Sequence, residues 1–253
     1  MLIEILFWFI ISLIFYSIFG YPLILFIITK FNKHYEKDSN TKSDQPSVTM
    51  LVSAYNEEAI IRNKIKNSLN IEYDNLEVVI ASDGSNDNTV SIAQEFEPQI
   101  SVFDFRKNEG KNVTLNKALQ KVSSDVIIFS DANTIFQKDA VKKLVEKFEN
   151  QEVGCVIGQL KLTQTNTTST SKGEGLYWKY EHLLKKLESR VGQVIVANGG
   201  NFAARKDVVG ELLPDIPNDF QIPMDTGTKG KKVLYEPDAI AYEKTSKDYK
   251  EEI

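Results

Sequence analysis

The fold is decided by residues 48–85, which read VTMLVSAYNEEAIIRNKIKNSLNIEYDNLEVVIASDGS. Residues 48–53 are an apolar run typical of a short buried strand, and Ile61, Ile65 and Leu69 then recur at helical spacing. A second apolar run follows at 77–81. A strand, a helix and a second strand in this order predict a right-handed β-α-β unit with parallel strands.

The same alternation continues along the chain. Further strands are expected at 100–103 and 125–129, and helical patterns occupy 90–96, 115–122 and 141–148. We therefore predict an α/β fold, a mostly parallel sheet with helices on both faces. Ligands bind such sheets in the crevice at the carboxyl ends of the strands, so polar residues that directly follow strands are candidate site residues.

The N-terminal segment differs sharply in composition. No charged residue occurs between Ile5 and Thr29, and roughly 25 apolar residues cross a ~30 Å hydrocarbon core as a helix. A secretory signal peptide fits less well because basic residues would precede it, and a buried core hairpin is the other alternative. Lys30 and further lysines follow, which places the rest of the chain in the cytoplasm.

These patterns predict three parts. Residues 1–32 are expected to be a single-pass transmembrane anchor in a bacterial inner membrane, with a possible kink at Gly20 and Pro22, and residues 33–46 a polar linker. Residues 47–253 are expected to form the α/β domain. An amphipathic helix is expected at 175–191, with core packing as the favoured explanation and contact with the membrane surface as the alternative.

Composition excludes some classes of function. The net charge of -5 argues against a general nucleic-acid binder, which needs a basic surface. Cys155 is the single cysteine, so no internal disulfide forms, and His34 and His182 lack the spacing of zinc ligands.

Polar residues follow the first two predicted strands directly. Tyr55 could support a nucleobase, while helix capping alone explains Asn56 and Glu57. Asp83 either accepts hydrogen bonds from a base or ribose, or belongs to an ordinary turn. The segment Lys107-Asn-Glu-Gly-Lys111 combines a glycine with two lysines and also suits a solvated turn.

The fourth predicted strand ends in Ser130-Asp-Ala-Asn133. Asp131 and Asn133 present the oxygen ligands that Mg²⁺ or Mn²⁺ prefers, with phosphates and water completing the shell. Such an ion neutralises charge on a departing diphosphate.

Together these segments resemble glycosyltransferase family 2. The resemblance covers residues 47–243 and rests on the order of seven segments: AYNE at 54–57, SDGS at 82–85, GKN at 110–112 with LNKAL at 115–119, SDAN at 130–133, ANGGNFAAR at 197–205, NDF at 218–220 and VLYEPDA at 233–239. It implies a Rossmann-like GT-A fold and an inverting single displacement. It also implies a UDP-type sugar donor, Mg²⁺ or Mn²⁺, and an acceptor hydroxyl in polysaccharide or glycoconjugate synthesis.

The resemblance assigns roles to individual residues. The donor-binding residues are Tyr55, Glu57, Asp83, Lys111 and Asp131, the metal ligands Asp131 and Asn133, the general base Asp219, and the acceptor-side residues Asn198, Gly199 and Gly200. Many family members have a second aspartate where this chain has Asn133, which implies weaker metal binding. Many membrane-bound relatives also continue beyond the position of Ile253 with an arginine-bearing helix and further spans, so a truncated form is expected.

The expected partners are a nucleotide-sugar donor, a glycan or lipid-linked acceptor and the membrane, but not nucleic acid. Two alternatives remain. A nucleotidyltransferase or sugar-nucleotide-binding module would use the Asp131 region without a base at Asp219. The other alternative is a catalytically silent membrane-bound homologue.

Overall fold

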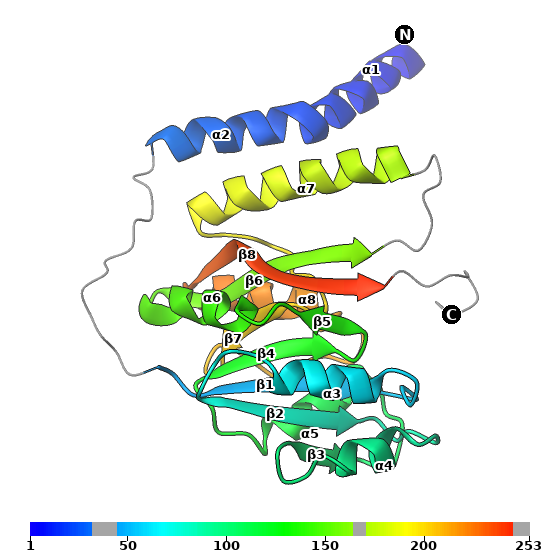
Figure 1. Cartoon of the computed structure of the whole chain (residues 1–253). Coiled ribbons are helices and arrows are strands. Elements are labelled where there is room, and N and C mark those ends of the chain that lie inside the picture. Colours follow the sequence, from blue (N-terminus) through cyan, green and yellow to red (C-terminus); the bar gives the residue numbers. More distant parts are fainter. Residues whose placement is uncertain (32–44, 164–170, 245–253) are drawn as a thin grey trace. The chain divides into compact units, whose positions relative to one another are not determined.

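The computed structural model describes residues 1–31, 45–163 and 171–244 (Figure 1). Most of the predicted linker at 33–46 and the C-terminal residues 245–253 lie outside these ranges. The described residues divide into two compact units. One holds 1–31 and 171–193, and the other holds 45–163 and 194–244.

The second unit is built on one sheet, whose eight described strands run in the order β3-β2-β1-β4-β7-β6-β8-β5. The strands are β1 Val48–Ala54, β2 Leu76–Ser82, β3 Ser101–Asp104, β4 Val126–Asp131, β5 Thr134–Phe136, β6 Val153–Thr163, β7 Phe202–Arg205 and β8 Lys232–Lys244. Strand β1 pairs in parallel with β2 and β4, β2 with β3, and β6 with β8. Strand β7 is antiparallel to β4 and β6, and β5 to β8. The predicted mostly parallel sheet is confirmed, with antiparallel strands added by its C-terminal half.

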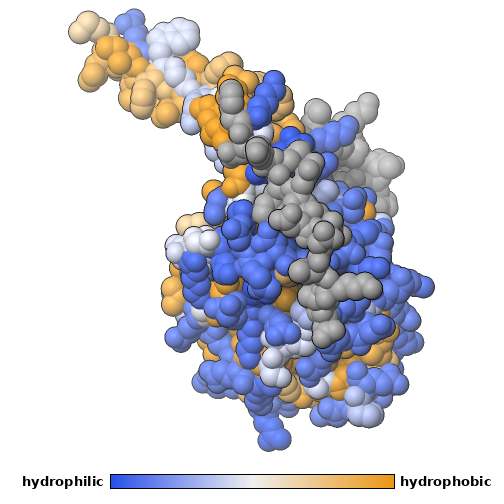
Figure 2. Space-filling model, turned by 90° about the vertical axis from the view of Figure 1, so that its left-hand side faces the viewer, coloured by the Kyte–Doolittle hydropathy of each residue, from blue (hydrophilic) through white to orange (hydrophobic). Residues whose placement is uncertain are grey.

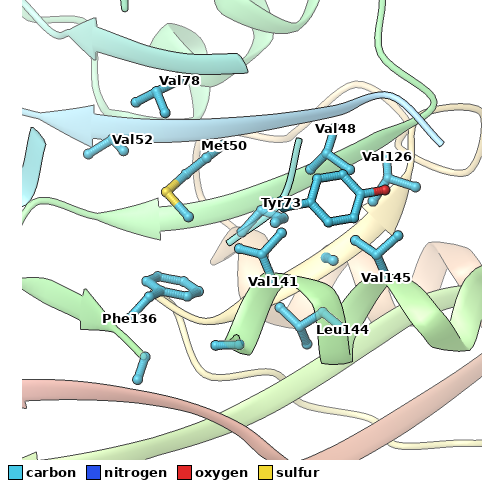
Figure 3. Packing of buried hydrophobic residues seen from close by; sticks show 14 of the residues in the cluster. Val48, Met50, Val52, Tyr73, Val78, Val126, Phe136, Val141, Leu144 and Val145 are labelled. Carbon is cyan, nitrogen blue, oxygen red and sulfur yellow. The ribbon is translucent and has the colours of Figure 1, made fainter. Parts of the chain in front are cut away.

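Helices cover both faces of the sheet. They are α3 Ile61–Leu69, α4 Thr89–Gln94, α5 Lys111–Leu119, α6 Ala140–Glu146 with the 3₁₀ turn η2 Lys147–Glu149, and α8 Asn218–Thr228. Alternate strand residues point to opposite faces, so Met50 joins the core under α3, α4 and α6, and Leu51 joins the core under α5 and α8. In Figure 3, Val141 and Leu144 of α6 point toward the side chains of β1. Burying each such side chain contributes about 1.5–3 kcal/mol.

Strand register brings three strand ends to one edge. Ser53 of β1 lies opposite Ala81 of β2 on one side and opposite Asp131 of β4 on the other. The polar segments that follow these parallel strands therefore emerge side by side.

The first unit contains a long apolar helix. It consists of α1 Leu2–Phe15, a π-helical turn η1 Tyr16–Gly20 and α2 Tyr21–Phe31. Proline lacks a backbone N–H and disturbs the regular helical ladder, and the π turn lies directly before Pro22. Residues Leu2–Lys30 are long and apolar enough to span a membrane, with a mean hydropathy of 2.3. Apolar side chains dominate the surface of this helix in Figure 2.

The amphipathic segment forms α7 Ser171–Val191, which packs along α2. The Tyr21 hydroxyl donates to Glu188 Oε1 at 2.9 Å, and the Tyr180 hydroxyl donates to the Ile18 carbonyl at 2.9 Å. Leu187 is buried while Tyr177 is exposed. One face of α7 thus packs on the N-terminal helix of the same unit.

Candidate active site

A pocket of about 260 Å³ lies at the shared edge where β1, β2 and β4 end. Its lining consists of Ser53, Ala54, Tyr55, Glu57, Asp83, Lys111, Thr114, Asp131, Ala132 and Asn133. The donor-side and metal-ligand residues expected from the sequence all belong to this set. Tyr55 is 45% exposed there, so part of this residue is available to a ligand.

Asp83 is buried and organises the wall of the pocket. Its carboxylate accepts hydrogen bonds from the backbone N–H groups of Glu109 and Gly110, at 2.9 and 3.0 Å, and from Thr114 Oγ1 at 2.7 Å. Gly84 follows with a φ of +69°, and a Cβ there would lie 2.6 Å from the Asn108 nitrogen. Asp83 therefore holds the 107–110 loop against the strand end, a task that its sequence context did not indicate.

Lys111 begins α5 and reaches across the pocket to Asp131. Its Nζ lies 2.5 Å from Asp131 Oδ1, to which Ser53 Oγ also donates at 3.2 Å. Gly110, which precedes it, has a φ of +95°, a conformation that glycine adopts without strain. The turn thus directs the lysine at the end of β4.

Asp219 is brought to the same place from α8. A Cβ on Gly199 would lie 3.4 Å from Asp131 Oδ2 and 3.5 Å from Asp219 Oδ2, so the two carboxylates flank a glycine without a side chain. The Ala197 N–H donates to the Asp219 carbonyl at 2.8 Å and ties this segment to α8. The sequence-predicted base and the metal ligand therefore share one cleft.

The other two acceptor-side residues support this arrangement. Asn198 Nδ2 donates to the Gly158 carbonyl at 3.1 Å, which fixes the segment to β6. A Cβ on Gly200 would lie 2.1 Å from Thr134 Oγ1. Gly200 is therefore required for close packing, whereas a Cβ at Gly199 would meet the two carboxylates only at ordinary contact distances.

The carboxylates of the cleft influence one another. Burial raises the pKa of the Asp219 carboxyl, Lys111 opposes this shift, and Asp131 adds to it. Burial also raises the pKa of Glu57, and the nearby Asp131 carboxylate raises it further. Among the pocket-lining residues, Lys111 carries the single ammonium group, and the other charged side chains are carboxylates.

Two residues that contact the cleft-lining segment but do not line the pocket escaped sequence reasoning, Lys64 and Glu243. Lys64 of α3 is fully buried and donates to Ser130 Oγ and to the Thr134 carbonyl, both at 2.6 Å. Burial lowers the pKa of Lys64 to about 7, and Asp131 partly opposes this shift. The sequence contained an indication that Lys64 is buried, because Lys64 lies beside Ile61 and Ile65 on the inward face of the helix.

Glu243 of β8 lies opposite Thr134 in the antiparallel pairing with β5. Asn133 Nδ2 donates to Glu243 Oε1 at 2.9 Å. Burial raises the pKa of Glu243, and the Asn133 hydrogen bond opposes this shift. No local motif marks this residue, so only the strand pairing reveals that it adjoins Asn133.

The oxygen atoms of Asp131 and Asn133 suit a metal ion that is also bound by substrate phosphates and water, rather than one that protein ligands enclose completely. Within residues 1–31, 45–163 and 171–244, no group of three or more His, Cys, Asp and Glu side chains forms a metal cluster. Mg²⁺ and ions like it bind through one or two carboxylates together with substrate phosphates and water. Asp131 and Asn133, which both line the pocket, fit that mode.

Comparisons with known proteins identify the family. The sequence profile described as glycosyl transferase family 2 matches residues 49–213. The chain is 25% identical over 244 residues to poly-beta-1,6-N-acetyl-D-glucosamine synthase of Staphylococcus aureus, covering 91% of this chain and 59% of that protein. It is also 25% identical over 248 residues to the probable glycosyltransferase YdaM of Bacillus subtilis, covering 87% of this chain and 56% of that protein. The chain thus spans less than two thirds of the length of these relatives.

Solved structures share the fold. The mannosyltransferase PcManGT from Pyrobaculum calidifontis, in complex with GDP-Man and Mn²⁺, superposes with a TM-score of 0.75 at 21% identity, covering 92% of this chain and 67% of that chain. S. aureus TarS 1-349 with UDP-GlcNAc gives a TM-score of 0.61 at 16% identity, covering 80% and 59%. The predicted GT-A-like architecture is confirmed. Because the family profile covers well over half of its residues, this chain belongs to glycosyl transferase family 2.

Proposed function

We propose that this chain is an inverting glycosyltransferase that moves a sugar from a nucleotide diphosphate donor, UDP first among the candidates, to an acceptor hydroxyl. The observation that carries the proposal is the approach of Asp131 and Asp219 to the same glycine, beside a pocket lined by Tyr55 and Lys111. A sugar-nucleotide-binding module needs no acid–base group on the acceptor side. The place of Asp219 therefore favours transfer over binding alone.

On the donor side, Tyr55 stacks on the base, while Asp83 keeps the 107–110 loop closed against the pocket. Lys111 exchanges its contact with Asp131 for the donor diphosphate and offsets its charge. A Mg²⁺ or Mn²⁺ ion held by Asp131 and Asn133 would supply Lewis-acid neutralisation of the departing diphosphate. Both GDP-Man with Mn²⁺ and UDP-GlcNAc occur in structures of the same fold, which supports a nucleotide-sugar donor.

On the acceptor side, the space at Gly199 admits a hydroxyl next to Asp219. The acceptor oxygen forms a bond to the anomeric carbon while the bond from that carbon to the diphosphate oxygen breaks. The Asp219 carboxylate takes the acceptor proton, and burial raises the pKa of Asp219 and makes it a stronger base. Proton transfer of this kind contributes ~10²–10⁴ in rate.

The N-terminal helix supports a reaction at a membrane. Leu2–Lys30 anchors the chain in the bacterial inner membrane, and the lysines that follow keep the α/β unit in the cytoplasm. A glycan or lipid-linked acceptor in polysaccharide or glycoconjugate synthesis suits this location. The polysaccharide synthase of S. aureus among the relatives supports this class of product.

The test is a donor screen with the full chain in detergent or nanodiscs. UDP- and GDP-sugars are added with Mn²⁺ or Mg²⁺, and both thermal stabilisation and release of the nucleoside diphosphate are measured. We expect one donor to raise the unfolding temperature in wild type and much less in Asp131→Ala. Absence of any shift at saturating donor and metal refutes the proposal.

A further inference from the structure

The β4–β5 connection, residues 130–134, carries both proposed metal ligands and is held by the amine of one buried lysine, Lys64. Lys64 of α3 is 0% exposed, and its Nζ donates to Ser130 Oγ and to the Thr134 carbonyl at 2.6 Å each. These two acceptors stand on either side of Asp131, Ala132 and Asn133. The lysine therefore bridges the two ends of the connection.

Further contacts from α3 reach Phe136 of β5, just beyond this connection. Asn67 Nδ2 donates to the Phe136 carbonyl and the Phe136 N–H donates to Asn67 Oδ1, both at 2.8 Å. Lys64 Nζ also lies 4.7 Å from the centre of the Phe136 ring. Helix α3 is thus joined through polar groups to the strand that follows the connection, and Lys64 donates to the residues on either side of the proposed metal ligands.

The hydrogen bonds of Lys64 also affect the acceptor-side glycines. Thr134, whose carbonyl binds Lys64, also presents the Oγ1 atom that allows no side chain at position 200. A shift of Thr134 would therefore move the Gly199–Gly200 segment as well. Lys64 thereby connects the position of Asp131 with that of the glycine pair.

Packing alone does not explain a lysine at this position. Its neighbours on the inward helix face include Ile61 and Ile65, and an apolar side chain of similar length would fill the space without the cost of burying an ammonium group. Burying this amine is costly, so its benefit must come from its hydrogen bonds to Ser130 and Thr134.

We propose that Lys64 is a positioning residue, which holds the 130–134 connection so that Asp131 and Asn133 face the donor diphosphate. This role rests on the proposed function of the pocket. Supporting groups behind metal or phosphate ligands typically change affinity by about 10–100-fold when they are removed.

The experiment compares Lys64→Met with Lys66→Met in the full chain. Lys66 is exposed on the same helix two residues away, so it is a matched control for loss of a lysine. The donor found in the screen is titrated calorimetrically with and without Mn²⁺, and thermal unfolding is recorded in parallel. We expect Lys64→Met to weaken donor binding roughly 10–100-fold while its unfolding temperature without ligand stays at or above that of wild type. Lys66→Met should remain within about twofold of wild type.

A purely structural role gives the opposite pattern, in which the unfolding temperature falls and donor affinity is kept. That result overturns the proposal. If Lys64→Met does not fold, Ser130→Ala replaces it, because this change removes one acceptor of the Lys64 ammonium. We then expect about fivefold weaker binding, the effect of one hydrogen bond, and unchanged affinity overturns the inference. Wild type that binds no nucleotide sugar refutes the proposed function instead.

Discussion

Replacing Asp219 with asparagine should separate proton transfer from donor binding. Asparagine has nearly the same shape, so the contact beside Gly199 and the backbone bond to Ala197 are kept. The neutral amide does not accept a proton from the acceptor. The expected loss is ~10²–10⁴ in rate, which corresponds to about 3–5 kcal/mol of transition-state stabilisation. Donor affinity should change little, because Lys111 and Asp131 remain in place.

The same substitution should make the folded protein more stable at neutral pH. Burial raises the pKa of Asp219 in the folded state. Between the unfolded value, about 3.9, and the raised value, the folded state binds more protons than the unfolded state. Stability therefore falls as pH rises through this window, and the cost is complete above it. Asp219→Asn removes that cost, so its advantage in unfolding temperature should disappear below about pH 3.9.

Three measurements check this reasoning: initial rates of nucleoside diphosphate release, calorimetric titration of the donor with Mn²⁺, and unfolding temperature over a pH series. Wild-type transfer should rise with pH through the raised pKa of Asp219, since the base acts when deprotonated. Asp215→Asn, at an exposed position shortly before α8, is the matched control and should behave as wild type. Transfer that stays within about tenfold of wild type in Asp219→Asn, or a parallel loss of donor affinity, refutes the assignment.

Four further predictions concern neighbouring features. Lys111→Met should weaken donor binding at the diphosphate, as calorimetry would show. The free energy of unfolding should change by less than about 1 kcal/mol, because the Lys111–Asp131 pair is partly exposed, and thermal unfolding measures this effect. Gly200→Ala should lower the free energy of unfolding by about 1–3 kcal/mol because its Cβ collides with Thr134, as denaturant titration would show. Gly199→Ala meets only ordinary contact distances and should keep stability and donor binding but slow transfer, which rate and binding assays separate. A reporter fused between the N-terminal helix and β1 should be cytoplasmic, and external labelling contradicts the topology.

Much of the fold was predictable because its determinants are local. Apolar runs and helical spacing within 48–145 predicted β1 to β4 and their helices, since strand and helix periods are visible in short windows. The pocket residues Tyr55, Asp83 and Asp131 follow strands directly, and parallel strands necessarily end at one edge. The apolar run before Lys30 likewise shows its length and composition without any tertiary information.

Other features depended on contacts between distant segments. Antiparallel β7, and with it the approach of Asp219 to Asp131, follows from strand pairing across the chain. The bond of Glu243 to Asn133 depends on the register of β8 against β5.

The sequence by itself determined the alternation of strands and helices, the apolar N-terminal helix and the polar residues at the strand ends, because each is encoded in neighbouring side chains. Only the tertiary structure decided that the Asp83 carboxylate holds a loop and that Lys64 donates hydrogen bonds to Ser130 and Thr134. The physical reason is that burial and hydrogen-bond partners are properties of the packed chain. The same aspartate in a local pattern suits a solvated turn equally well, and a lysine on an inward helix face does not reveal its hydrogen-bond partners.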